Sequence, residues 1–126
     1  MFETAREILH YAEEELEKAL KLNDMFLYRN AADKAFLALI IAINEYIKRV
    51  KGVEPKSHSE RRKILREIGR EDLRALYSDL MRTLHDEAFH GGIYQPDEVE
   101  YAIRKIREII DKLEAEVSKL REGEKL

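Results

Sequence analysis

An arginine and two histidines near residue 85 are the residues of this sequence best suited to chemistry. Arg82, His85 and His90 supply one guanidinium and two imidazoles within a short segment. A guanidinium stabilises a phosphate or its pentavalent transition state, and an imidazole transfers protons near neutral pH. Together these groups suit a metal-free cleavage of RNA in which the 2′-hydroxyl attacks the adjacent phosphate. We therefore predict Arg82, His85 and His90 as candidate catalytic residues.

Helical periodicity places part of this group on one face of a helix. At about 100° per residue, Arg82, His85 and Phe89 lie roughly 140° to 200° around the axis from Leu80, which belongs to a stripe of leucines. They therefore face away from the core that the leucines predict. An exposed phenylalanine beside an arginine and a histidine is typical of a protein interface or of the wall of a site. We predict Phe89 as an interface residue.

A purely structural interpretation of the same segment is also open. His90 falls in the last helical turn before Gly91, where an imidazole interacts favourably with the helix dipole and glycine ends the helix. Arg82 has Asp79 three residues before it and Asp86 four residues after it, and either carboxylate would form a local ion pair. In that case the segment would carry no ligand.

The stretch between Lys48 and Arg74 is the second candidate site. It holds ten basic and five acidic residues, a net charge of +5 in a chain whose total is −3. A basic stretch on an acidic protein favours contacts with phosphates, above all where arginine dominates. The candidate RNA- or phosphate-binding residues are His58, Arg61, Arg62 and Arg66. The alternative interpretation is a solvated helix with local ion pairs.

Two Glu-x-x-His pairs have the spacing found in the di-iron sites of helix bundles. They are Glu7 with His10 and Glu87 with His90. Glu7 and His10 lie roughly 140° to 160° from the middle of the apolar stripe of their helix, so they face solvent and cannot converge with ligands from other helices. The chain has no cysteine, which excludes disulfides, thiolate ligands and cysteine nucleophiles. We predict no metal site and no cofactor.

The elements that must position these residues are helices throughout. Apolar residues recur at helical spacing along the whole chain, and no alternating strand pattern with turn signals occurs. The five Gly and two Pro fall between these periodic segments. We predict one all-α domain, residues 1–126, that forms an up-and-down bundle of about five helices, four long and one short. The predicted helices cover 3–22, 26–50, a short segment from Ser57 or Ser59 to Gly69, then 71–91 and a last helix after Pro96.

The last predicted helix carries a regular apolar seam. Its members alternate steps of four and three residues: Val99, Ile103, Ile106, Ile110, Leu113, Val117 and Leu120. Such a seam can dock on the first helix of the same chain or pair with a second copy. The spacing alone does not decide between these two arrangements.

Composition and hydropathy indicate the setting of the protein. The longest apolar run, Ala35 to Ile43, is too short to span a membrane, and the first residues lack a basic-then-apolar signal pattern. We therefore expect a cytoplasmic protein with no membrane partner. One Gln and three Asn stand against nineteen Glu and eleven Lys, a depletion of thermolabile amides that indicates a thermophilic source.

Several short motifs follow one another in a distinctive order. They are Asn30-Ala31-Ala32-Asp33-Lys34-Ala35-Phe36, then Pro55-Lys56-Ser57-His58, then Leu84-His85 and Phe89-His90-Gly91-Gly92 ahead of the long last helix. Over nearly the whole chain this order resembles the HEPN superfamily, most closely its archaeal PaREP-type branch.

The resemblance implies an up-and-down helical bundle that is often a dimer. In the ribonuclease members, an arginine and a histidine separated by four to six residues meet their copies at the dimer interface. Other members have lost this motif and bind nucleotides or serve as partner proteins, for example beside minimal nucleotidyltransferases in toxin–antitoxin pairs. In this chain His85 follows Arg82 after two residues and His90 follows after seven, so the spacing of the ribonuclease motif is not met.

Three functions follow as hypotheses. The favoured one is a non-catalytic, HEPN-like homodimer that binds RNA, a nucleotide or a partner protein through the Arg82, His85 and Phe89 face and the basic third helix, in a toxin–antitoxin or defence context. The first alternative is a metal-independent endoribonuclease whose arginine and histidines come from both subunits of a dimer. The second is a purely structural interaction protein that uses the seam of the last helix.

Overall fold

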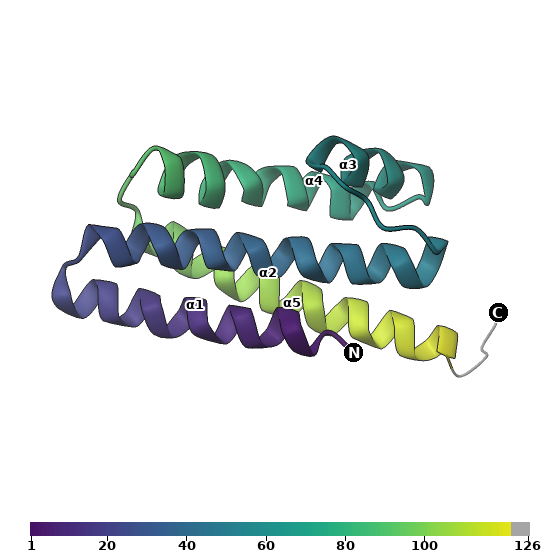
Figure 1. The fold of residues 1–126 in the computed structure, drawn as a ribbon, viewed down its shortest axis with the longest axis horizontal. Helices are drawn as coiled ribbons and strands as arrows, with labels where there is room; N and C mark the ends of the chain where they lie inside the picture. Colours follow the sequence, from purple (N-terminus) through teal and green to yellow (C-terminus); the bar gives the residue numbers. More distant parts are fainter. Residues whose placement is uncertain (122–126) are drawn as a thin grey trace.

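The chain folds into long helices that run up and down beside one another (Figure 1). The computed structural model describes residues 1–121, and these contain no strand. The helices are α1 (Glu3–Leu22), α2 (Met25–Lys51), α3 (His58–Glu67), α4 (Glu71–Leu80), η1 (Met81–His90) and α5 (Pro96–Arg121). The π-helix η1 continues α4 without a break, since Leu80 and Met81 both keep right-handed helical dihedrals. The predicted all-α bundle of four long rods and one short helix is therefore confirmed.

The turn between α1 and α2 is made by two polar residues. Asn23 ends α1 in a left-handed conformation with φ 53°, which asparagine tolerates better than most residues. Asp24 caps α2, because its carboxylate accepts hydrogen bonds from the backbone N–H of Phe26 at 2.9 Å and of Leu27 at 3.2 Å. These bonds satisfy donors that have no partner inside the helix, so α2 begins directly and runs antiparallel to α1.

A capping box fixes the start of the short helix α3. The side chain of Ser57 accepts a hydrogen bond from the backbone N–H of Glu60 at 3.0 Å. The carboxylate of Glu60 reaches back and accepts one from the backbone N–H of Lys56 at 2.7 Å. The serine-to-glutamate spacing predicts the bond to Ser57, whereas the return bond goes to Lys56, one residue before the cap. The cap places His58 at the first position of the helix.

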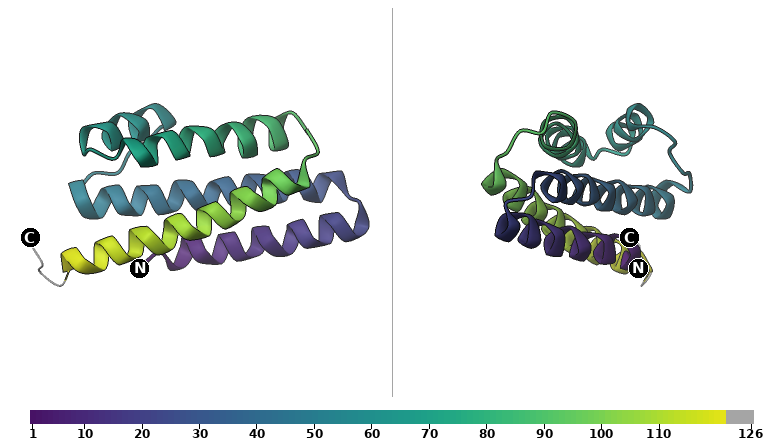
Figure 2. Two further views of the ribbon diagram at one scale, coloured as in Figure 1. Left: turned by 180° about the vertical axis from the view of Figure 1, so that it is seen from behind. Right: turned by 60° about the vertical axis from the view of Figure 1, so that its left-hand side comes forward.

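The helix α2 is the centre of the bundle. It contacts α1, α3, η1 and α5, and the end-on view in Figure 2 shows it between the layer of α1 and α5 and the layer of α3, α4 and η1. Alanine side chains let its neighbours approach closely, and the buried ones are Ala31, Ala32, Ala35, Ala38 and Ala42. The wide apolar face predicted for this segment therefore packs against several neighbouring helices.

The apolar seam of α5 is used inside the chain. Six of its seven members are buried, namely Val99, Ile103, Ile106, Ile110, Leu113 and Val117. The helix packs against α1 and α2, crossing them diagonally (Figure 2). Of the two arrangements that the spacing allows, docking within the chain is therefore the one that occurs, and only Leu120 at the end of the seam is exposed.

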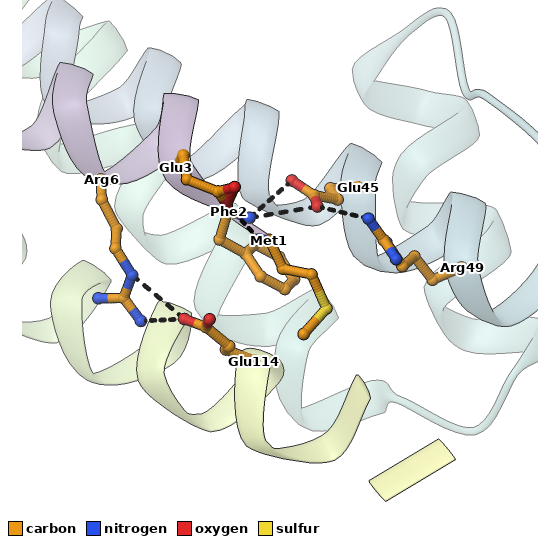
Figure 3. A network of polar contacts seen from close by, with 7 residues as sticks. All are labelled: Met1, Phe2, Glu3, Arg6, Glu45, Arg49 and Glu114. Carbon is orange, nitrogen blue, oxygen red and sulfur yellow. Dashed lines mark hydrogen bonds and ion pairs between the residues drawn. The ribbon is translucent and has the colours of Figure 1, made fainter. Parts of the chain in front are cut away.

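A polar network ties the beginning of the chain to the bundle (Figure 3). The backbone N–H of Phe2 donates to both carboxylate oxygens of Glu45 at 3.2 Å, and Glu45 also pairs with Arg49 at 3.3 Å. The guanidinium of Arg6 binds Glu114 of α5 at 2.5 Å. These contacts join α1, α2 and α5 at one end of the molecule.

Within residues 1–121, no helix has the length and apolar character needed to cross a bilayer.

Candidate functional site

Three histidines from two helices meet beside α2. His58 begins α3, whereas His85 and His90 lie on η1. The ring centroids of His58 and His85 are 6.2 Å apart, and those of His85 and His90 are 4.5 Å apart in an edge-to-face contact. We call these three residues the histidine cluster. The structure thus brings together one predicted phosphate-binding residue and two predicted catalytic residues.

The π geometry of η1 explains why His90 reaches His85. The backbone N–H of Gly91 donates to the carbonyl of Asp86 at 2.9 Å, a bond that spans five residues where an α-helix spans four. Residues five apart then lie roughly 50° apart around the axis, whereas in an α-helix they lie about 140° apart. Phe89, four residues after His85, stacks on it with centroids 6.0 Å apart and planes at 17°, a spacing that brings two side chains together in an α-helix as well. The predicted angular positions assumed an α-helix here, and the π-helix corrects them.

Arg82 lies apart from the cluster. Its guanidinium pairs with Asp79 at 2.6 Å, and both side chains are largely exposed. Three residues span roughly 115° to 120° around a π-helix but about 60° around an α-helix, so the winding of η1 turns Arg82 away from His85. The ion pair with Asp79 is one of the two that the structural interpretation predicts. A catalytic role for Arg82 stays a prediction.

Arg61 holds α3 against the bundle. Its Nε donates to the side-chain oxygen of Asn44 at 2.7 Å, and its Nη1 lies 3.4 Å from both the Tyr77 hydroxyl and His58 Nδ1. Only 8% of the residue is exposed. The sequence predicts Arg61 as a phosphate-binding residue, with a solvated helix as the alternative, but the structure places its guanidinium among buried partners. The positive charge of Arg61 is therefore buried next to His58 and opposes the protonation of that imidazole.

His58 is held in an environment that opposes its protonation. Its Nδ1 lies 2.5 Å from the hydroxyl oxygen of Tyr77. Burial lowers the pKa of His58, and the positive charges of Arg61 and Arg62 add to the effect. Burial also raises the pKa of Tyr77, which therefore keeps its proton at neutral pH. At neutral pH His58 is accordingly an uncharged imidazole.

His85 stands between two aromatic rings. Its centroid is 5.5 Å from that of Phe36 on one side and 6.0 Å from that of Phe89 on the other. Its Nδ1 is buried and has no hydrogen-bond partner among the described residues; the carboxylate of Asp33 lies 3.9 Å away. A buried ring nitrogen without a partner is uncommon in folded proteins. This nitrogen is therefore an unsatisfied polar atom inside the cluster, and Asp33 is the carboxylate nearest to it.

Arg29 fixes the end of η1. Its Nε donates to the carbonyl of Phe89 at 2.7 Å and its Nη2 to the carbonyl of His90 at 3.1 Å. These carbonyls belong to the last turn of the helix, where no backbone donor is available to them. Phe89 and His90 are thus held in position by the fold.

The predicted basic face of α3 is only partly free. Arg62 is half-buried next to His58, but Arg66 lies 3.8 Å from Glu71. Elsewhere in the basic stretch, Arg70 binds Asp72 and Glu116. Local ion pairs therefore neutralise part of the charge, as the alternative interpretation expects, although Arg62 itself forms no ion pair within residues 1–121.

The Glu-x-x-His pairs do not build a metal centre in the described part of the chain. His10 is exposed and pairs with Glu14 at 3.3 Å on its own helix. His90 belongs to the histidine cluster instead. Residues 1–121 contain no group of three or more His, Asp or Glu side chains arranged to hold a metal ion.

Several residues of the site were not predicted from the sequence. Asn44 and Tyr77 sit within apolar stripes, and Phe36 is a regular member of the core pattern of α2. One signal was present, because Asn44 is a polar residue on a helix face that is otherwise apolar. The partners of Arg29 lie sixty and sixty-one residues away, and no local pattern indicates such contacts.

One family of known proteins matches this chain. The model of the archaeal PaREP1/PaREP8 family matches residues 7–110, a segment that contains the histidine cluster and every residue described around it. No curated protein and no solved structure gives a significant match.

Proposed function

The chain belongs to the archaeal PaREP1/PaREP8 family, and we propose that it binds RNA through the histidine cluster and the adjacent side of α3 without cleaving it. The observation that carries this proposal is the convergence of His58, His85 and His90, with centroid separations of 6.2 Å and 4.5 Å. Imidazoles donate hydrogen bonds to phosphate oxygens, and they gain charge on protonation close to neutral pH.

The surroundings of the cluster support a phosphate ligand. Arg62 adds a guanidinium next to His58, and guanidinium groups bind phosphates with good geometry. Asp33 and Asp86 lie in the same neighbourhood, so their carboxylates offset the charges of Arg61 and Arg62. Binding of phosphates here is therefore moderate in strength and depends on salt.

Binding is tested with a labelled single-stranded RNA and fluorescence anisotropy at several salt concentrations. Arg62→Glu should weaken binding about tenfold or more and reduce the slope of log affinity against log salt by about one. Lys112→Glu is the matched control, since Lys112 is exposed on α5, on the other side of α2. Binding that is absent, or equal in the Arg62→Glu variant and the parent, contradicts the proposal.

A metal-independent endoribonuclease is the second candidate, because the two imidazoles of His58 and His85 differ in environment. A neutral imidazole can take the proton of the 2′-hydroxyl, while a protonated one gives a proton to the departing 5′-oxygen. The products would be a 2′,3′-cyclic phosphate and a free 5′-hydroxyl. Incubation of RNA with the protein in EDTA tests this: cleavage lost in His58→Gln and His85→Gln would favour the enzyme, and intact RNA excludes it.

The remaining expectations are proposals about assembly. We propose a homodimer, membership of the HEPN superfamily and, in a toxin–antitoxin or defence context, a nucleotidyltransferase as the partner protein. The helical bundle and the order of motifs support these statements. Sedimentation of the purified protein tests the homodimer, and a monomer would also exclude a nuclease site built from both subunits with Arg82.

A further inference from the structure

Four aromatic rings form a column that runs from the core to the surface at the histidine cluster. The centroids of Tyr77 and Phe36 are 5.6 Å apart with planes at 31°, those of Phe36 and His85 are 5.5 Å apart at 30°, and those of His85 and Phe89 are 6.0 Å apart at 17°. The inner two rings are buried and the outer two are partly exposed. Tyr77 and Phe36 are 0% and 2% exposed, the His85 side chain is 29% exposed, and Phe89 is partly exposed. Phe89 therefore ends the column on its partly exposed side.

Phe89 contributes little to the hydrophobic core. It belongs neither to the buried core nor to the partly buried apolar residues that pack against it. Its aromatic neighbours are the imidazoles of His85 and His90, the latter at 4.9 Å with planes at 61°. Part of Phe89 thus stays accessible to solvent beside two imidazoles.

The ring of Phe89 is also held in place before any ligand arrives. Arg29 binds the carbonyls of Phe89 and His90, and the neighbouring His85 is itself fixed between two rings. A surface group that is already ordered loses little conformational entropy on binding. These are the properties of a platform on which a flat ligand can stack.

We infer that Phe89 is a stacking platform for an unpaired nucleobase, so that the RNA bound at this site is single-stranded. The inference rests on the proposed function, since the histidine cluster holds the phosphates beside the base. Every nucleobase has a flat π face that stacks on aromatic side chains, whereas bases within a duplex are stacked on one another and are not available. A base is uncharged, so the nearby carboxylates of Asp33 and Asp86 do not oppose it.

Replacement of the ring tests the inference. Phe89→Leu keeps apolar volume but removes the aromatic face, and it should weaken binding of a single-stranded RNA about tenfold without changing the salt dependence. Binding of an abasic oligonucleotide of the same length should not change. Tyr101→Leu is the matched control, because Tyr101 is an exposed aromatic residue beside two cations on α5.

A second readout reports on stacking directly. The chain has no tryptophan, so Phe89→Trp introduces a single indole at the platform. Single-stranded RNA should quench its fluorescence, whereas the abasic oligonucleotide and a duplex of the same sequence should not.

The outcomes separate the two proposals. If no RNA binds, the proposed function and this inference both fail. If the single-stranded, abasic and duplex oligonucleotides bind alike, or if Phe89→Leu binds as the parent does, the inference fails and the phosphate-binding function stands.

Discussion

The folded state opposes the protonation of His58. Burial lowers its pKa, and the charge of Arg61 adds to this lowering. In the unfolded chain an imidazole has a pKa of about 6.5. Between the folded and the unfolded pKa the unfolded state binds more protons at this position than the folded state, so the contribution of His58 to stability is present above the unfolded pKa and is lost as the pH falls through the lower, folded pKa.

We therefore expect the free energy of unfolding to decrease when the pH is lowered from about 7.5 to about 5.5, the range in which imidazoles titrate. His58→Gln should show a weaker decrease, because the variant has no imidazole to protonate there. His10→Gln serves as control, since His10 is exposed at the surface of α1. Urea unfolding at each pH measures the effect. If His58→Gln and the parent show the same pH dependence, protonation of His58 does not contribute to the loss of stability.

Arg61 and Arg62 are adjacent in sequence but differ in what they do. Arg61→Ala leaves the side-chain oxygen of Asn44 without its donor, and we expect a loss of about 1–3 kcal/mol in the free energy of unfolding. Arg62→Ala removes a half-buried charge with no ion-pair partner in residues 1–121, and we expect a change within about 0.5 kcal/mol. Denaturant unfolding measures both variants. Similar losses in the free energy of unfolding would show that the contacts of Arg61 do not stabilise the fold more than those of Arg62.

The positions of the helices are predictable from the sequence, because helix caps and apolar stripes depend on residues close to one another in the chain. The capping residues Asp24 and Ser57 act on donors within three residues of themselves, so their patterns are readable. The apolar stripes of α1 and α5 are readable as well, because burial follows the α-helical period. These features locate the helices, and the position of α3 then places His58.

The π-helix is the feature that periodicity could not reveal. An α-helical period assigns His90 to a different face from His85, whereas the winding of η1 joins them and turns Arg82 away. The burial of Arg61 is likewise invisible locally, since its partners Asn44 and Tyr77 lie seventeen and sixteen residues away. The sequence therefore predicts two of the three cluster residues as catalytic and the third as a phosphate ligand, but not that they form one cluster.

Gly91 is required where η1 ends. A Cβ at this position would lie 2.8 Å from the carbonyl oxygen of Glu87 and 3.2 Å from that of Asp86, and both atoms belong to the backbone. Gly91→Ala should therefore force the last turn to shift and cost about 1–3 kcal/mol, with displacement of His90 and weaker RNA binding. Thr83→Ala in the same helix should change stability by about 0.5 kcal/mol or less. Thermal unfolding and the anisotropy assay check both effects, and an unperturbed Gly91→Ala variant would show that the end of η1 adjusts freely.

The whole molecule separates its structural surface from its candidate binding surface. The helices α3, α4 and η1 form one layer on α2 (Figure 2), and the cluster contacts α2 through Phe36 and Asp33. The seam of α5 belongs to the opposite layer and is buried within the chain. A ligand or a partner on the exposed side of the cluster therefore does not compete with the contacts of α5, and a function that depends on the α5 seam as an intermolecular surface would require the fold to open.

The burial of the seam can be tested through the concentration dependence of unfolding. Ile106→Ala and Ile110→Ala each remove a fully buried side chain and should lower the free energy of unfolding by about 2–5 kcal/mol. If the seam serves only this chain, that loss is the same at micromolar and at a hundredfold higher protein concentration, because mass action enters only where unfolding also dissociates subunits. Leu120→Ala, at the exposed end of the seam, should have little effect. A loss that grows with protein concentration would instead mean that two copies share the seam in solution, which would restore the structural hypothesis that the fold of one chain disfavours.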